Sequence, residues 1–158
     1  MSTDALTHLT YMQRALDLAR KSMDSGNRPV ASLIVRDGEV IGSGVNTMLS
    51  DHDPSAHAEV AAIREAGAKL KTIDLSGSTL YSTLECCPMC FWCMQEAKIT
   101  RVVLGGRYAG IGRTDLGRYT VESFREFTGR PLEIITGVLQ TECEAVRLEW
   151  MRKESKNK

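Results

Sequence analysis

The stretch TLECCPMCFWC (residues 83–93) joins a predicted strand to a predicted helix and contains four of the chain's five cysteines. The residues leading into it, STLYSTL (78–84), are rich in the β-branched and polar-aromatic side chains typical of a strand. Pro88 is tolerated in the first turn of a helix, so it marks a helix start directly after Cys87. Cys87 and Cys90 would then lie at the mouth of this helix, where N–H groups and the helix dipole favour thiolates.

Strands and helices alternate along the rest of the chain. Before residue 78 the patterns predict an amphipathic helix (4–25), a β-hairpin (30–35 and 39–46, turning at Asp37-Gly38), a polar loop (47–55), and a helix from residue 56 that ends at Gly67 or soon after. After residue 98 they predict a strand (101–106), a helix (120–128), a strand (132–139) and a helix (141–153). We therefore expect an α/β fold, a three-layer α-β-α sandwich whose later strands are parallel. We expect one domain over residues 1–158, with about 152–158 as a flexible basic tail.

The charge of the chain is balanced. Twenty basic residues offset twenty acidic ones, so no strong field attracts nucleic acid or a membrane surface. The N-terminus lacks the apolar core of a signal peptide, and no apolar run reaches the roughly 20 residues of a membrane span. These features predict a cytoplasmic protein, in which clustered cysteines serve a metal or catalysis rather than disulfides.

A histidine elsewhere in the chain supplies a third metal ligand. His57 stands in His57-Ala58-Glu59 at the start of a predicted helix, and one His with two Cys leaves the fourth position of zinc open, as in catalytic sites. Glu59 could accept a proton from the water held there. Either Cys87 with Cys90 or Cys90 with Cys93 satisfies the pair spacing, and the helix start at Pro88 favours the first pair.

The remaining cysteines of the cluster have simpler interpretations. Cys86 precedes the turn and Cys93 lies a turn deeper in the helix, so both are expected to pack in the interior. A redox pair formed by Cys87 and Cys90 would explain neither His57 nor Glu59. Taken singly, Glu59 could also be an ordinary acidic residue favoured by the first turn of a helix.

The combination of His-Ala-Glu with Cys-Pro-Met-Cys about thirty residues later resembles the zinc-dependent cytidine and nucleobase deaminase superfamily. DPSAHAEVAAIREA (53–66), TLYSTLE (79–85) and RVVLGG (101–106) are most similar to the branch of guanine, cytosine and tRNA adenosine deaminases. Departures from the family pattern are Cys86 in place of proline, Ala31 in place of glycine, bulky Phe91 and Trp92 after the second ligand cysteine, and a segment 107–117 without the lysine of tRNA deaminases.

This resemblance implies a cytidine deaminase-like fold with a central five-stranded mixed sheet, and a zinc-dependent hydrolase that releases ammonia. His57, Cys87 and Cys90 would bind zinc, and Glu59 would be the proton shuttle. Asn46, otherwise a turn former, and the backbone of Ala58 would hold the substrate ring. Relatives in this branch also imply a homodimer.

The substrate is the open part of this interpretation. Balanced charge and short length favour a free nucleobase or nucleoside, guanine- or cytosine-type, and argue against nucleic acid as a partner. A tRNA-specific adenosine deaminase is the alternative enzyme. A non-catalytic, zinc-stabilised binding module is the alternative of another class, although structural zinc would not need Glu59.

Overall fold

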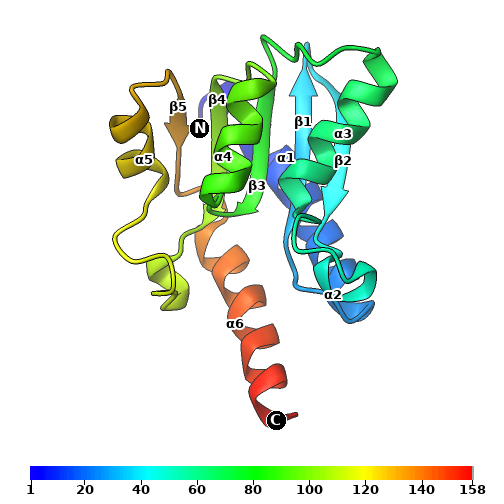
Figure 1. The fold of residues 1–158 in the computed structure, drawn as a ribbon, viewed down its shortest axis with the longest axis vertical. Coiled ribbons are helices and arrows are strands. Elements are labelled where there is room, and N and C mark those ends of the chain that lie inside the picture. Colours follow the sequence, from blue (N-terminus) through cyan, green and yellow to red (C-terminus); the bar gives the residue numbers. More distant parts are fainter. Residues whose placement is uncertain (158) are drawn as a thin grey trace.

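A five-stranded sheet with the strand order β2-β1-β3-β4-β5 forms the centre of the computed structural model, which describes residues 1–157 (Figure 1). The strands are β1 (Ala31–Arg36), β2 (Glu39–Val45), β3 (Thr79–Leu84), β4 (Arg101–Gly106) and β5 (Glu133–Ile135). β1 pairs antiparallel with both β2 and β3, whereas β3 with β4 and β4 with β5 are parallel. The predicted mixed sheet with parallel later strands is confirmed.

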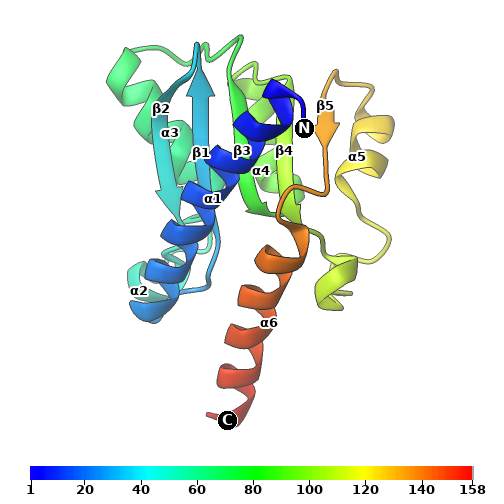
Figure 2. The ribbon, with the colours of Figure 1, turned by 180° about the vertical axis from the view of Figure 1, so that it is seen from behind.

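Helices cover both faces of this sheet. One face carries α3 (Ala58–Leu70), α4 (Pro88–Glu96) and α5 (Val121–Thr128), and the other carries α1 (Thr3–Asp24) and α6 (Gln140–Lys156) (Figures 1 and 2). Two short helices, α2 (Met48–Asp51) and the 3-10 helix η1 (Ala109–Ile111), lie in the connections. Within the described residues, none of these helices has both the length and the apolarity that crossing a bilayer needs.

Alternating side chains of the strands form two cores. Ile34, Leu80 and Val102 belong to the buried cluster beneath α3 and α4. Their strand neighbours Leu33, Tyr81 and Val103 belong to the cluster beneath α1 and α6, as the period of two along a strand requires. Both faces of the sheet are therefore covered by buried apolar side chains. Because a shift of one residue would move these side chains to the opposite face, this burial fixes the register of the strands.

Glycine in β2 lets α3 lie unusually close to the sheet. A Cβ atom placed on Gly44 would overlap the carbonyl oxygen of Ala58 and lie 2.5 Å from the backbone nitrogen of Ala62. Because these are backbone atoms of a helix, no side-chain rotation could relieve the overlap. Gly44 thus sets the depth of the first turn of α3, directly beside His57.

Three segments differ from the sequence-based expectation. The loop 47–55 contains the helical turn α2, for which Asn46 Oδ1 accepts a hydrogen bond from Met48 N–H. The predicted strand 132–139 is reduced to β5, because Gly137 turns the chain at φ +83°. Helix α6 continues to Lys156 and so includes residues expected to form a flexible tail. The Glu, Arg and Lys residues of its end are good helix formers, and Glu149 pairs with Lys153 one turn on.

Candidate active site

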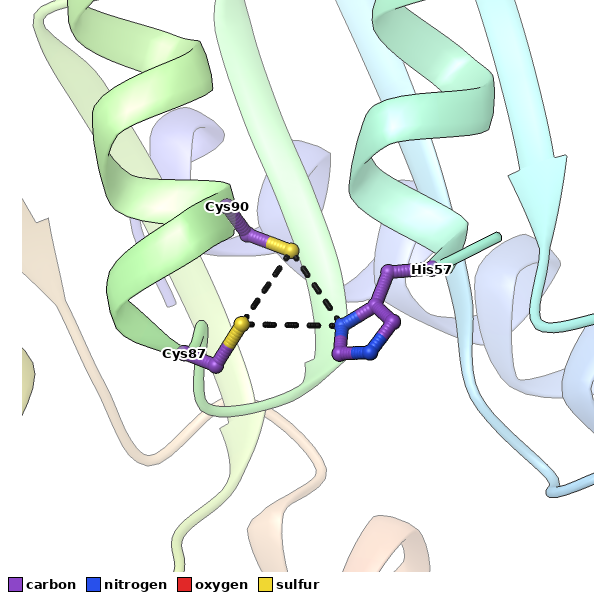
Figure 3. A group of neighbouring side chains, drawn as sticks. All are labelled: His57, Cys87 and Cys90. Carbon is purple, nitrogen blue, oxygen red and sulfur yellow. Dashed lines mark hydrogen bonds between the residues drawn. The ribbon is translucent and has the colours of Figure 1, made fainter. Parts of the chain in front are cut away.

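Two helix N-termini bring the predicted metal ligands together. His57 is the N-cap residue of α3 and Cys87 is the N-cap residue of α4, with Pro88 following at the first helical position as predicted. The Sγ atoms of Cys87 and Cys90 lie 3.6 Å apart, and each lies 3.5 Å from His57 Nδ1 (Figure 3). The three side chains thus form a triangle between the two helices.

The dimensions of this triangle match a tetrahedral zinc site. Zinc bonds to sulfur at about 2.3 Å and to nitrogen at about 2.0 Å, which places tetrahedral ligands about 3.8 Å (S to S) and about 3.5 Å (S to N) apart. The observed separations agree with these values to within a few tenths of an ångström. One nitrogen and two sulfurs would hold a zinc ion with three protein ligands and leave a fourth ligand to be supplied from outside the protein.

Protons are shared within the triangle. The hydrogen bond between the two cysteine sulfurs lowers the pKa of Cys87 to about 4 and raises the pKa of Cys90. The hydrogen bond to Cys87 in turn raises the pKa of His57. A divalent cation bound at this triangle would favour the thiolate forms of both cysteines.

Glu59 lies in the first turn of α3 and is 3% exposed. The hydroxyl of Ser82 on β3 lies 3.3 Å from its Oε1. Burial raises the pKa of the Glu59 carboxyl above its usual value. A carboxyl group with a raised pKa can both accept and return a proton near neutral pH, which is the requirement for general acid–base chemistry.

The two predicted substrate-binding residues lie beside this carboxyl group. Asn46, at the end of β2, lines the same cavity as His57 and Glu59. Its Oδ1 accepts from Met48 N–H, so its Nδ2 is the group able to donate to a ligand. Ala58 is fully buried and opens α3, where the first N–H groups of a helix have no partner within the helix. The structure thus brings all six predicted site residues to one place.

Comparison with protein families agrees with this geometry. Residues 6–106 match the model of the cytidine and deoxycytidylate deaminase zinc-binding region, a span that contains all six residues. The chain belongs to this zinc-binding deaminase family. The predicted resemblance, the zinc cofactor and the assignment as a deaminase enzyme are therefore confirmed.

Individual members of the deaminase family resemble the chain over most of its length. The tRNA-specific adenosine deaminase of Bacillus subtilis is 33% identical over 150 residues, which cover 94% of this chain and 91% of that enzyme. The structure of a tRNA:A34 deaminase superposes with a TM-score of 0.74 at 31% identity, covering 87% of this chain and 98% of that one. A guanine deaminase from Nitrosomonas europaea superposes with a TM-score of 0.80 at 25% identity, covering 90% and 83%.

Sequence reasoning missed three arginines in this deaminase's cavity. Arg28, Arg113 and Arg147 line it together with the predicted residues. They come from the segment before β1, from the segment after η1 and from α6, so nothing in their spacing along the chain indicated that they meet. The sequence offers only a mild basic excess over residues 101–158, with 11 basic and 8 acidic residues, and this excess does not indicate a position in the fold.

The wall of the cavity is held by a buried ion-pair network. Glu85, directly after β3, accepts hydrogen bonds from Arg107 Nε (3.0 Å) and Nη2 (3.1 Å), and from the backbone N–H groups of Tyr108 (3.0 Å) and Val121 (2.9 Å). Arg107 also binds both carboxylate oxygens of Glu122. This network links the ends of β3 and β4 to α5 and holds Tyr108 at the cavity. Both carboxylate oxygens of Glu85 accept hydrogen bonds within the network, so Glu85 is not the group that binds a ligand.

The residues that depart from the family pattern lie behind or outside the site. Cys86 and Phe91 are fully buried in the core beneath α3 and α4, and half-buried Cys93 packs against that core, in agreement with their predicted packing role. Trp92 on α4 is instead 40% exposed, under the guanidinium of Arg130.

Proposed function

We propose that this deaminase hydrolyses the exocyclic amino group of a purine nucleoside held in RNA, with an adenosine of tRNA as the first candidate. The observation that carries the chemical part is that buried Glu59 lines the same cavity as His57, which forms a triangle of possible metal ligands with Cys87 and Cys90. A merely structural metal site needs no adjoining buried carboxyl group, which argues against the non-catalytic binding module.

Each site residue has one task in this proposal. His57, Cys87 and Cys90 hold zinc, which when bound lowers the pKa of a water molecule toward neutrality. Glu59 accepts a proton from that water, donates it to the ring nitrogen next to the reacting carbon, and carries a second proton to the departing ammonia. The amide of Asn46 and the N–H of Ala58 bind the ring edge and present the amino-bearing carbon to the water.

The choice of substrate departs from the free base or nucleoside that overall charge favoured. The full-length relatives at 31 to 33% identity are named tRNA-specific adenosine deaminases. Net charge is also a poor guide here, because three arginines gather at the cavity and, in the described part of the chain, only Arg113 among them pairs with a carboxylate. These two observations support the tRNA alternative better than the free base, and make nucleic acid the expected partner.

A free guanine-type base is the second candidate. The likeness to the Nitrosomonas europaea guanine deaminase favours it, as does the small inner cavity, whose volume of about 30 Å³ is close to that of a single water molecule. Any base must displace side chains to enter, and a free base displaces fewer of them than a nucleotide in a folded RNA.

We also propose that the chain forms a homodimer. Met89 and Trp92 lie one turn apart on α4 and are 39% and 40% exposed. Ile73, which follows the end of α3, is 84% exposed. Exposed large apolar side chains such as those of Met89 and Trp92 on one helix are typical of subunit contacts. A second copy of the chain is the partner that the family resemblance implies.

The substrate can be tested with zinc-loaded protein and a panel of two classes. An adenosine-containing anticodon stem-loop represents RNA, and guanine, cytosine, adenosine and cytidine represent free bases and nucleosides. We expect inosine in the digested stem-loop, formed at a rate that falls steeply between about 50 and 200 mM salt because phosphates are being bound. Ammonia release from a free base alone, at a rate insensitive to salt, would contradict the RNA substrate and support the second candidate.

A further inference from the structure

The three arginines of the cavity stand between two hollows. The inner one, also lined by His57 and Glu59, is the candidate active site. The outer one has a volume of about 300 Å³ and is lined by the same Arg28, Arg113 and Arg147, with Thr114, Asp115, Ile111 and Met151 completing its wall. A ligand whose ring occupies the inner cavity would place its next substituent in the outer hollow, against three guanidinium groups.

The positive charge of this arginine cluster is only partly compensated. Arg113 forms hydrogen bonds of 2.6 and 3.0 Å with the carboxylate of Asp115. Within residues 1–157, neither Arg28 nor Arg147 pairs with a carboxylate. The cluster therefore carries about two positive charges more than its acidic neighbour supplies.

Two of the arginines are partly buried and keep buried donor atoms without a partner. The Nε and Nη1 atoms of Arg147 and the Nε of Arg28 are inaccessible to solvent and have no hydrogen-bond partner among the described residues. Burial, together with the charges of Arg28 and Arg113, lowers the pKa of Arg147 to about 10. Unpaired donors of a buried charged group are costly, so a fold that keeps them points to a ligand that satisfies them.

Aromatic rings hold the guanidinium groups in place without neutralising them. Arg147 lies 4.5 Å and Arg28 5.9 Å from the centre of the Trp150 ring, and Arg113 lies 4.6 Å from that of Tyr108. Stacking of this kind fixes the plane of each guanidinium; it leaves N–H groups of Arg28 and Arg147 free, whereas Nε and Nη2 of Arg113 are bonded to Asp115. Two guanidinium groups with free donors, and the remaining N–H groups of Arg113 beside them, surround one hollow and can donate to a tetrahedral oxyanion.

We propose that Arg28, Arg113 and Arg147 form a phosphate-binding site that holds the phosphate attached to the nucleoside whose base is deaminated. This phosphate site rests on the proposed function, because that function places the base beside Glu59. The site adds that the substrate class is a phosphorylated nucleoside rather than a free base. The phosphate can belong to a mononucleotide or to a phosphodiester of RNA. The same guanidinium forks serve both.

Binding to a catalytically silenced protein tests the site apart from turnover. In zinc-loaded Glu59→Gln protein, titration calorimetry would compare adenosine, adenosine 5′-monophosphate and the anticodon stem-loop. We expect at least one of the two phosphate-bearing ligands to bind roughly 10- to 100-fold more tightly than adenosine, the range of one or two charge-assisted hydrogen bonds. Arg147→Gln should remove most of this preference, whereas Arg152→Gln, an exposed arginine on the same helix, should leave it intact.

The two phosphate sources and the two hypotheses give different outcomes. If Arg147→Gln abolishes the preference for adenosine 5′-monophosphate over adenosine, the site belongs to a mononucleotide. If Arg147→Gln abolishes only the preference for the stem-loop over adenosine, the site belongs to a phosphodiester. Equal binding of all three ligands, or a preference unaffected by Arg147→Gln and by Arg113→Gln, would overturn the phosphate site. A third outcome separates the two hypotheses. If Glu59→Gln protein shows phosphate-dependent binding but the parent protein releases no ammonia from any purine, the phosphate site is supported and the proposed function is refuted.

A stability measurement covers the case in which Arg147 matters only for folding. A partly buried guanidinium with unpaired donors costs stability, so Arg147→Met should leave the thermal midpoint of the ligand-free protein unchanged or raise it. Inorganic phosphate should raise the midpoint of the parent protein and not that of Arg147→Met. A lower midpoint for Arg147→Met, with an equal phosphate response, would show a packing role and contradict the proposal.

Discussion

Adding a single methyl group at Gly44 should damage the metal site without touching a ligand. The Cβ of Gly44→Ala would lie 2.5 Å from Ala62 N and 2.7 Å from Ala61 Cβ, and would overlap Ala58 O. Heavy atoms in contact need about 3.5 Å, so the first turn of α3 must move outward by about 1 Å. His57, the N-cap residue of that helix, would move with it while Cys87 and Cys90 stay on α4.

The size of this shift decides the expected effect. Metal–ligand distances tolerate changes of about 0.2 Å, so a displacement of about 1 Å either breaks the bond from His57 or forces the helix back against the sheet. We expect zinc affinity to fall at least tenfold and the free energy of unfolding of the metal-free protein to fall by about 1–3 kcal/mol, the usual cost of overpacking.

Competition with a chromophoric chelator would measure zinc affinity, and urea denaturation would measure stability. Gly42→Ala is the matched control, because its Cβ would crowd Ala62 and Ala66, further along α3 from His57. It should lower stability by a similar amount and zinc affinity by less. Unchanged zinc affinity and stability in Gly44→Ala would refute the argument that this glycine sets the position of His57.

Two further predictions concern the ligand assignment and the assembly. Cys87→Ser and Cys90→Ser should lose bound zinc, measured by elemental analysis, whereas Cys93→Ser and Cys86→Ser should keep about one ion per chain; zinc loss from Cys93→Ser instead of Cys87→Ser would show that the other cysteine pair is used. Sedimentation at micromolar concentration should show a dimer that Trp92→Glu converts to a monomer, and a monomeric parent protein would contradict the assignment of the α4 surface as a subunit contact.

The metal site was predictable because each of its parts is encoded locally. Pro88 fixes a helix start, and the helix start fixes which cysteines face its mouth. His57 and Glu59 belong to a second helix start of the same kind. Only the meeting of the two helices is a tertiary event, and the resemblance to a deaminase family supplied it. The sheet was predictable for a related reason, since its strands carry continuous apolar runs bounded by turns.

The arginine cluster could not be predicted in this way. Arg28, Arg113 and Arg147 belong to three segments that meet only because β1 and β4 are both central strands and α6 returns across the sheet. Counting charge over the whole chain hid the cluster, because Glu and Asp on distant surfaces cancel it in the sum. A local concentration of charge, set by topology, is what a ligand encounters.

The differences in secondary structure have a similar origin. The apolar run that predicted a strand over 132–139 contains Gly137, whose left-handed conformation ends the pairing of β5 with β4. The polar composition that predicted a tail after residue 151 is equally compatible with an exposed helix, which is what α6 forms. Composition alone distinguishes neither case.

Mass spectrometry of the product formed in ¹⁸O-labelled water tests the central claim most directly. If Glu59 and the triangle of His57, Cys87 and Cys90 carry out hydrolytic deamination, each ammonia released from the purine leaves one labelled oxygen on the ring. The parent protein should therefore yield labelled product, and Glu59→Gln, with the same zinc content, should yield roughly 10²- to 10⁴-fold less. Ammonia release without incorporation of label, or equal turnover by Glu59→Gln, would contradict the account.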